Sequence, residues 1–250
     1  MPAISALSGL RGLSSMAGGA AFNPRSVPGL AQDINPARGR YQDAAGTLLA
    51  LADGDPLGRL LDQSGGGNDL TQSVAAKRPT LKWVSNGLRA FWTARFDGVD
   101  DFLQFVSPLG VNGGSVYCVS RWNVLSSFSV SLGLSAGTEG YLREEGTTSN
   151  RLYLPEASVY TTLWQDGAQV NLGGGGTDFA VADLRQYHVY AMPANGAAVS
   201  LAYVGQNFSN NISWWSGDLV RLLVYSAAHT AAQRQQVERG LGRLYGISVP

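Results

Sequence analysis

Three aspartates, Asp97, Asp100 and Asp101, form the clearest acidic cluster in the chain. Carboxylate oxygens are ligands that Ca²⁺ prefers, so this cluster is a candidate calcium site. The alternative is structural, because Asp97 and Asp100 flank a tight turn at Gly98, where their side chains can accept backbone N–H groups. The residues alone leave both interpretations open.

A second group of residues is suited to binding a sugar. Such sites combine aromatic faces, which contact the C–H groups of the sugar ring, with a few polar side chains that fix its orientation. The candidates are Trp164 beside Asp166, the pair Trp214 and Trp215, and Tyr141. Because Trp214 and Trp215 are neighbours in a predicted strand, one should face the core and the other should face outward. The alternative is that these aromatic side chains only pack the sheets or an interface.

Residues for nucleophilic catalysis or for a soft-metal centre are scarce. The chain has one cysteine, Cys118, and two histidines, His188 and His229, and neither histidine has a recognisable Ser/His/Asp context. A single cysteine excludes an internal disulfide and a cysteine-based zinc cluster. The four glycines at 173–176 are not a phosphate-binding loop, because no Lys-Ser/Thr pair or helix follows them. We expect no cofactor.

The composition is that of a neutral, β-rich chain of 250 residues. Eighteen Lys and Arg balance 18 Asp and Glu, so net charge gives no reason to expect nucleic acid as a partner. Charged residues are only 14% while glycine is abundant at 32, which suits short strands joined by tight turns. The apolar runs are too short to span a membrane, and the first residues do not resemble a secretory signal, so we expect no membrane partner.

Apolar segments predict a series of short strands from residue 89 onward. Segments 89–96 and 102–106 flank Asp97-Gly98 and are predicted to pair around that turn. Segment 115–122 is predicted to be the next strand. Segment 128–134 alternates strictly, which predicts a strand with one buried and one solvated face.

Turn signals continue this pattern toward the C-terminus. Asp-Gly at 166–167 predicts a hairpin, and segment 187–192 is predicted to pair with 198–203 across Asn-Gly at 195–196. Strands at regular spacing without helices between them indicate an antiparallel sandwich rather than a parallel α/β sheet.

One helix is predicted, from near Ala231 to Tyr245. Thr230 is a good N-cap residue, Gln233 completes a capping box, and Gly246 provides the C-terminal stop. The residues of its apolar stripe are Val237, Leu241, Leu244 and Tyr245. This helix should pack on the sandwich and be structural.

Three segments carry distinctive motifs. Residues 62–72 read DQSGGGNDLTQ, residues 95–103 read RFDGVDDFL, and residues 215–225 read WSGDLVRLLVY. They resemble a loop, a turn and the closing strand of the concanavalin A-like (laminin-G-like) jelly-roll domain, particularly the variety of bacteriophage virion proteins and bacterial surface proteins. Arg221 departs from the pattern, which has an acidic residue there. The resemblance spans about residues 40–247, and because the aspartate-rich turn recurs in it as a fold feature, it favours the structural interpretation of that turn.

The fold prediction is therefore an all-β protein. It is an antiparallel two-sheet jelly-roll sandwich over residues 26–250, of concanavalin A-like type, with a C-terminal helix and an extended N-terminal arm over residues 1–25. A glycosidase needs two carboxylates across the sugar, and glucanases of this fold carry theirs with the spacing E-x-D-x-x-E. None of the five glutamates stands in that spacing. We expect that the protein is not an enzyme.

The predicted arm is rich in small residues and cannot build a core of its own. It is either a disordered terminus or a segment that a partner orders. Its apolar residues recur about every third position, which is the reason to consider the second interpretation. The candidate anchoring residues are Ile4, Leu7, Leu10, Leu13, Met16 and Phe22.

Two compatible functions follow from these observations and from the resemblance. The first is a structural protein of a phage particle, such as a head decoration or a fibre or spike component. It would be assembled in the host cytoplasm, exposed on the virion surface, anchored through the arm to capsid or tail proteins and homo-oligomeric. The second is a lectin-like carbohydrate-binding module of a bacterial surface or secreted protein, and either protein could bind a host-surface glycan.

Overall fold

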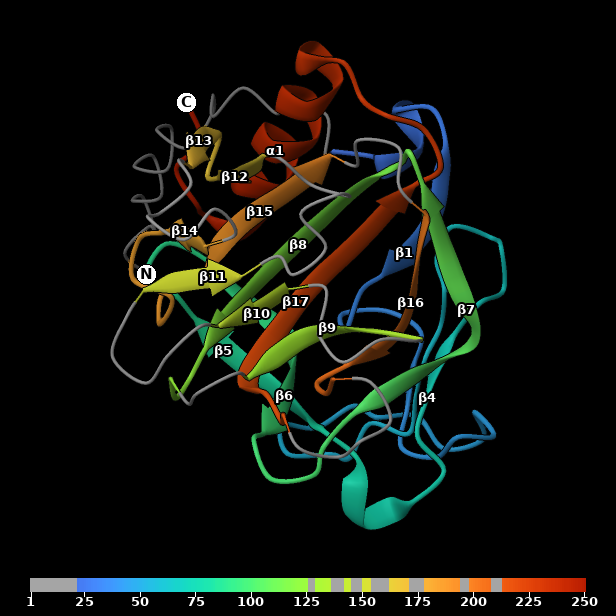
Figure 1. The fold of residues 1–250 in the computed structure, drawn as a ribbon. Helices are drawn as coiled ribbons and strands as arrows, with labels where there is room; N and C mark the ends of the chain where they lie inside the picture. The colour runs from blue at the N-terminus through green and yellow to red at the C-terminus, as the bar shows by residue number, and fades with distance from the viewer. Residues whose placement is uncertain are drawn as a thin grey trace, which may run out of the picture.

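The computed structural model describes residues 22–125, 129–135, 142–144, 150–153, 162–170, 178–193, 198–207 and 213–250. These residues form two antiparallel β-sheets that pack face to face, with one α-helix on the outer side of one sheet (Figure 1). This arrangement confirms the predicted all-β sandwich with a C-terminal helix. Most of the predicted arm, residues 1–21, lies outside the described residues.

The first sheet, sheet A, is built around the long strand β17. In spatial order it contains β13 (Ala168–Val170), β12 (Leu163–Gln165), β15 (His188–Pro193), β8 (Ser115–Trp122), β17 (Ser216–Tyr225), β6 (Ala90–Asp97) and β5 (Thr80–Ser85). The remaining strand, β1 (Leu30–Ile34), pairs with the second half of β17, while β6 pairs with its first half. The middle of β17 therefore lies where three strands meet.

The second sheet, sheet B, covers the inner face of sheet A. In spatial order it contains β14 (Asp178–Ala180), β11 (Arg151–Tyr153), β10 (Leu142–Glu144), β9 (Val130–Leu134), β16 (Ala198–Val204), β7 (Leu103–Asn112), β4 (Leu70–Thr71), β3 (Arg59–Leu60) and β2 (Arg40–Tyr41). Two 3-10 turns complete the described elements, η1 (Pro24–Ser26) and η2 (Ala75–Lys77).

Apolar side chains fill two layers, one on each face of sheet A. Large aromatic residues such as Phe96, Trp122 and Trp215 are fully buried between the sheets. On the other face, Val237 and Leu241 bury the apolar stripe of the helix against sheet A. Because sheet A is covered on both faces, its central strands β8 and β17 are almost entirely buried.

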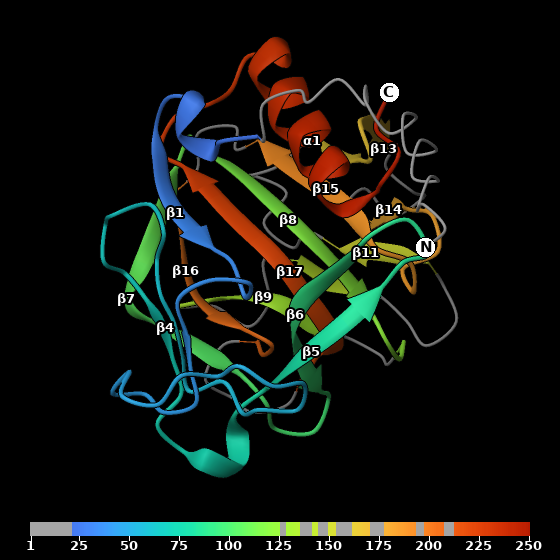
Figure 2. The same cartoon turned by 180° about the vertical axis from the view of Figure 1, so that it is seen from behind.

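Helix α1 (Ala231–Tyr245) has the predicted bounds and the predicted caps. The Thr230 hydroxyl accepts a hydrogen bond from the Gln233 backbone N–H, and the Gln233 side chain accepts one from the Thr230 N–H at 2.9 Å. Gly246 ends the helix with a φ of 68°, a conformation that glycine adopts without strain. Figure 2 shows α1 crossing the outer face of sheet A. Among the described residues, no helix is long and apolar enough to cross a membrane.

Two predicted strand pairings are wrong. β6 pairs with β5 and β17 in sheet A, whereas β7 pairs with β4 and β16 in sheet B. The Asp97-Gly98 turn therefore carries the chain from one sheet to the other. Likewise β15 lies in sheet A beside β8 and β12, and β16 lies in sheet B. The connection between them, residues 194–197, lies outside the described residues.

The prediction for 128–134 is also wrong in one respect. Strand β9 is buried along its whole length, although its apolar residues alternate with Ser131 and Gly133. It lies inside sheet B between β10 and β16, and the Ser131 hydroxyl donates a hydrogen bond to the Leu142 carbonyl oxygen at 3.2 Å. The polar face is satisfied by the protein instead of by water, so alternation did not indicate solvent exposure here.

Candidate functional site

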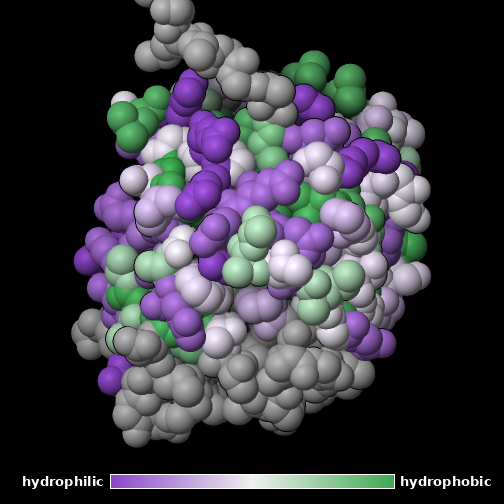
Figure 3. All heavy atoms as spheres, turned by 90° about the horizontal axis from the view of Figure 1, so that it is seen from above, coloured by the Kyte–Doolittle hydropathy of each residue, from purple (hydrophilic) through white to green (hydrophobic). Residues whose placement is uncertain are grey.

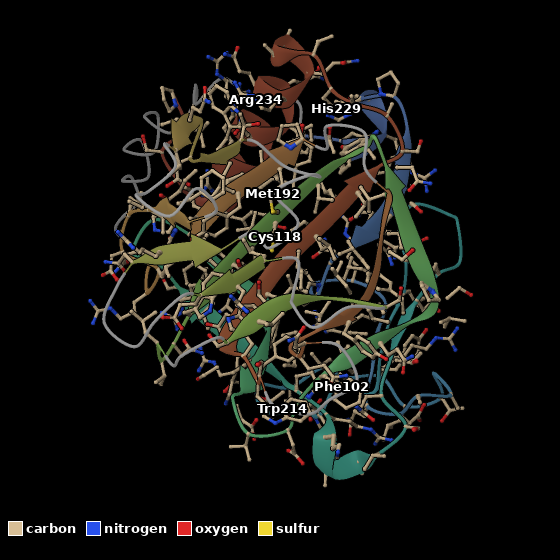
Figure 4. All side chains as sticks on the ribbon, viewed as in Figure 1. Phe102, Cys118, Met192, Trp214, His229 and Arg234 are labelled. Carbon is tan, nitrogen blue, oxygen red and sulfur yellow. The ribbon has the colours of Figure 1, made fainter. Side chains whose placement is uncertain are left out.

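The predicted site residues fall at two separate places. Trp214 and Trp215 lie beside the aspartate-rich turn, because the next residue, Ser216, pairs with Asp97 where β17 meets β6. Trp164 lies against Arg234 of α1, and Asp166 stands in the turn two residues further on. Figure 4 shows Arg234 at the α1 end of the molecule and Trp214 at the end away from it. The other predicted site residues lie outside the described residues; they are Tyr141, Ile4, Leu7, Leu10, Leu13 and Met16.

The aspartate-rich turn is held by its own carboxylates. Asp97 Oδ1 accepts the backbone N–H groups of Val99, Asp100 and Asp101 at 2.8, 3.3 and 3.4 Å. Asp101 Oδ2 in turn accepts the N–H of Asp97 at 3.1 Å. The turn-capping carboxylates are therefore Asp97 and Asp101, and no described backbone N–H donates to the side chain of Asp100.

The same three carboxylates each place an oxygen within 4.8 Å of the others. Burial raises the pKa of Asp101 to about 7, and the negative charges of Asp97 and Asp100 add to this shift. A bound cation would oppose both effects, so calcium would compete with a proton at Asp101. The geometry therefore accommodates both a calcium site and a turn-capping role for the cluster. The hydrogen bonds of the turn-capping role are present in the structure.

Trp215 is a core residue and Trp214 is not. The Trp215 ring is fully buried, stacked on Phe96 with centroids 5.2 Å apart and in contact with Trp122 at 5.7 Å. Its neighbour Trp214 is only half-buried. This confirms that one ring faces the core and the other faces outward, and it leaves Trp214 as the one available to a ligand.

Trp214 belongs to an aromatic platform, which we define as Trp214, Phe102 and Tyr203. Phe102 lies 6.0 Å from Trp214 and 6.1 Å from Tyr203 between ring centroids, and all three rings are half-buried. Figure 4 shows Phe102 and Trp214 side by side at this end of the molecule. The ammonium group of Lys77 lies 5.9 Å from the centre of the Trp214 ring. The platform thus combines apolar faces with a nearby cation.

A cavity of about 650 Å³ adjoins the aspartate-rich turn. Polar groups on its wall come from both sheet A and the η2 segment. The lining residues that can hydrogen-bond through their side chains are Arg78, Thr80, Arg95, Asp97, Asp101, Asn123 and Ser216. Because Phe102 directly follows Asp101, the cavity and the aromatic platform lie at the same end of the sandwich. Together they form the candidate functional site.

Arg95, a residue of the cavity wall, is hydrogen-bonded to a buried carboxylate that the sequence analysis did not identify. Asp218 is fully buried and accepts two hydrogen bonds from Arg95 at 2.7 and 2.8 Å, one from Arg121 at 2.9 Å and one from the Tyr187 hydroxyl at 2.6 Å. Burial acts to raise the pKa of Asp218, but Arg95 and the other donors outweigh it and hold the pKa below its usual value. This ion cluster fixes the Arg95 guanidinium at the cavity.

The pair Trp164 and Asp166 is used within the fold. The Arg234 guanidinium lies 3.4 Å from the centre of the Trp164 ring and forms a buried ion pair with Glu238 on α1. Asp166 Oδ2 lies 2.5 Å from His188 Nδ1. Burial acts to lower the pKa of His188, but the bond to Asp166 outweighs it and raises the pKa. These contacts join α1 to β12 and the β12–β13 turn to β15, and the Arg234 guanidinium covers one face of the Trp164 ring.

The remaining histidine and the cysteine are also structural. His229 Nδ1 and the Tyr117 hydroxyl are 2.7 Å apart, and burial lowers the pKa of His229. Burial raises the pKa of Cys118 to about 12, so its thiol is a weak nucleophile. Phe22, the described member of the arm residues, packs against Gly240 of α1, where a Cβ would lie 2.3 Å from the Phe22 ring.

Comparison with known proteins adds no family to this description. The chain matches no protein-family model and no curated protein. What the site can do therefore has to be inferred from its residues.

Sequence reasoning found Trp214 and the aspartates but missed Phe102, Tyr203 and Lys77. Phe102 and Tyr203 stand in apolar strand-like segments, where an aromatic residue is normally a core residue. Lys77 directly precedes Arg78 and Pro79 and gave no signal of its own. The only available clue was the position of Phe102 next to the acidic cluster.

Proposed function

We propose that the protein is a non-enzymatic structural component of a bacteriophage particle, a head decoration or a fibre component of concanavalin A-like type, that binds a host-surface glycan. The observation that carries the binding part is the half-buried aromatic platform beside a polar cavity at one end of the sandwich. The virion setting rests on the resemblance to phage domains. Both parts have separate tests.

The motifs of the resemblance support a concanavalin A-like assignment because their polar residues hold loops of the sandwich. Asp62 Oδ1 accepts the backbone N–H groups of Asp33 and Ser64 at 3.1 and 2.8 Å. Asn68 exchanges two hydrogen bonds with the backbone of Ser107, both at 2.9 Å. Residues that tie a loop to the sheets in this way are expected to recur with the fold.

The aromatic platform supports glycan binding on chemical grounds. The exposed parts of Trp214, Phe102 and Tyr203 offer apolar faces to the C–H groups of a sugar. Asn123 and Arg78 on the cavity wall offer donors for its hydroxyl groups. Small-molecule sites usually combine an apolar surface with a few such polar groups. No described pair of carboxylates across this cavity is free of turn-capping bonds, which is in keeping with binding without hydrolysis.

A glycan array tests the binding part. The full chain should bind a defined class of glycan, and Trp214→Ala should weaken that binding by at least about tenfold, or about 1.4 kcal/mol. Trp83→Ala is the matched control, because Trp83 is 52% exposed on β5 and lines no part of the cavity. Equal binding by both variants, or no binding by the wild type, would contradict the proposed glycan site.

The virion part is tested by shortening the arm. Phe22 packs on α1, and Arg25 donates a hydrogen bond to the Gln63 carbonyl oxygen at 2.8 Å, so the deletion should stop at residue 20. We expect the shortened chain to keep its thermal stability and to be lost from particles assembled in cells that supply no full-length copy. Normal incorporation would contradict anchoring by the arm.

The aromatic platform also favours a second candidate function, a lectin-like module of a bacterial surface or secreted protein. The two tests separate the candidates. Glycan binding that depends on Trp214, without any association of the full chain with particles, would favour the second candidate over the first.

A further inference from the structure

A second cavity, of about 700 Å³, lies on the outer side of sheet A between the N-terminal turn η1, the end of β1 and the C-terminal end of α1. Figure 2 views the molecule from this side, with η1 and β1 on one flank, α1 on the other and β17 between them. It shares no lining residue with the cavity beside the aspartate-rich turn. Its polar lining includes Arg25, Asp33, Arg38, Gln63, Arg221 and Tyr245.

An ion pair forms the floor of this cavity. Arg221 on β17 donates a hydrogen bond from Nη2 to Asp33 Oδ2 at 2.7 Å, and its Nε lies 2.7 Å from Asp33 Oδ1. Both side chains are more than nine-tenths buried. The charge of Arg221 is therefore balanced by Asp33, and the guanidinium is held in a fixed orientation. This contact also explains how a basic residue is accommodated where the resembling family has an acidic one.

Two further guanidinium groups flank the ion pair. Arg25 comes from η1 and donates to the Gln63 carbonyl oxygen at 2.8 Å, while Arg38 follows β1 and is exposed. Within the described part of the chain, neither Arg25 nor Arg38 forms an ion pair with a carboxylate. Three arginines and one aspartate line the cavity, and the carboxylate of Asp62 lies beside Asp33 behind the lining. Three positive charges therefore oppose two negative ones, which leaves an excess of one positive charge.

All three arginines line this one cavity, and their charges act on groups of its wall. Burial raises the pKa of Asp33, and the charges of Arg221 and Arg25 act in the opposite direction. Burial likewise raises the pKa of Tyr245, and Arg221 and Arg38 oppose that shift. Each arginine is therefore close enough to influence a group on the cavity wall. Figure 3, which looks onto the end that carries α1, shows hydrophilic residues interspersed with apolar ones on the described surface there.

We propose that this cavity binds a small anion through a carboxylate or phosphate group held between Arg25 and Arg38 above the Arg221–Asp33 ion pair. A planar guanidinium offers paired donors that fit both groups, and such charge-assisted hydrogen bonds are stronger than neutral ones. The side chain of Asn35 and the ring of Tyr245 extend the wall, so the rest of the ligand can be polar and ring-shaped. The anion arrives either as a free phosphate or as an acidic sugar, and the two sources share this chemistry.

The test is isothermal titration calorimetry on the full chain at low ionic strength. Inorganic phosphate and glucuronate are the two anionic probes, and glucose is the neutral counterpart of glucuronate. We expect saturable binding of at least one anion and none of glucose, with the anion that binds identifying the source. Binding of glucose as strong as that of glucuronate, or binding of neither anion, would overturn the proposal.

Variants of the exposed arginines locate the site. Arg38→Ala and Arg25→Ala should each weaken anion binding by about tenfold, because each removes a charge-assisted contact. Arg185→Ala is the matched control, since Arg185 is an exposed arginine that lines neither cavity. An equal loss in Arg185→Ala would indicate a diffuse charge effect, and an unchanged affinity in Arg38→Ala would place the anion elsewhere. Either result contradicts the proposed site.

Discussion

Replacement of Asp101 by asparagine should flatten the pH dependence of the protein's stability between about pH 4 and pH 7. Burial and the charges of Asp97 and Asp100 raise the pKa of Asp101 from 3.8 to about 7 in the folded protein. Over this range the unfolded chain has lost the Asp101 proton while the folded protein still holds it. The free energy of unfolding therefore falls as the pH rises, by at most about 1.4 kcal/mol per pH unit.

The size of the effect follows from the width of this window. Over about three pH units, the free energy of unfolding can fall by at most about 4 kcal/mol. Screening by solvent around the loop should reduce this loss to about 2 kcal/mol. The variant keeps the turn, because an asparagine oxygen can still accept the Asp97 N–H that Asp101 Oδ2 accepts at 3.1 Å. Glu238, whose pKa burial also raises to about 7, contributes equally to both proteins and cancels in the difference.

Urea unfolding of the wild type and of Asp101→Asn, measured at intervals from pH 4 to pH 8, checks this reasoning. The wild-type stability should fall relative to that of the variant as the pH rises. Asp100→Asn removes one of the charges that raise the pKa of Asp101. In this variant stability should still fall with rising pH at the same rate, but over a narrower pH range. Parallel stability curves for the wild type and Asp101→Asn would refute the account.

Three further predictions concern the core and the reaction class. Gly217→Ala should destabilise the fold by about 2 kcal/mol or more in thermal or urea unfolding, because its Cβ would lie 2.1 Å from Cε2 of Trp215. Arg221→Ala should cost about 3–5 kcal/mol in the same assay, because it leaves the buried Asp33 carboxylate without its partner, and a loss below 1 kcal/mol would contradict this. No polysaccharide should be hydrolysed in a reducing-sugar assay, and turnover that disappears on changing a single carboxylate residue would prove the non-enzymatic proposal wrong.

Local structure could be read from the sequence where the deciding contacts lie within a few residues. The bounds and both caps of α1 follow from Thr230, Gln233 and Gly246, whose bonds reach no further than one helical turn. The hairpin between β12 and β13 follows from Asp166 and Gly167, which have φ values of 52° and 83°, the positive values that such a tight turn requires.

The sheet in which each strand lies was decided only by the tertiary structure. Asp97-Gly98 reads as a hairpin turn, yet β6 and β7 belong to different sheets. A turn that reverses the chain within a sheet and one that carries it across to the other sheet use the same residues. The choice depends on the strand with which each flanking segment pairs. β6 pairs with β17 and β7 pairs with β16, and both partners lie far away in the sequence.

The candidate sites divide in the same way. The sequence determined that Trp214 and Trp215 face opposite sides, because side chains alternate along an extended chain. Only the tertiary structure placed Trp214 against Phe102, and only it brought Arg221 to Asp33, which is 188 residues away in the chain. No local pattern specifies such contacts, because they arise when the two sheets and the helix close around a common core and leave particular polar side chains together at its edges.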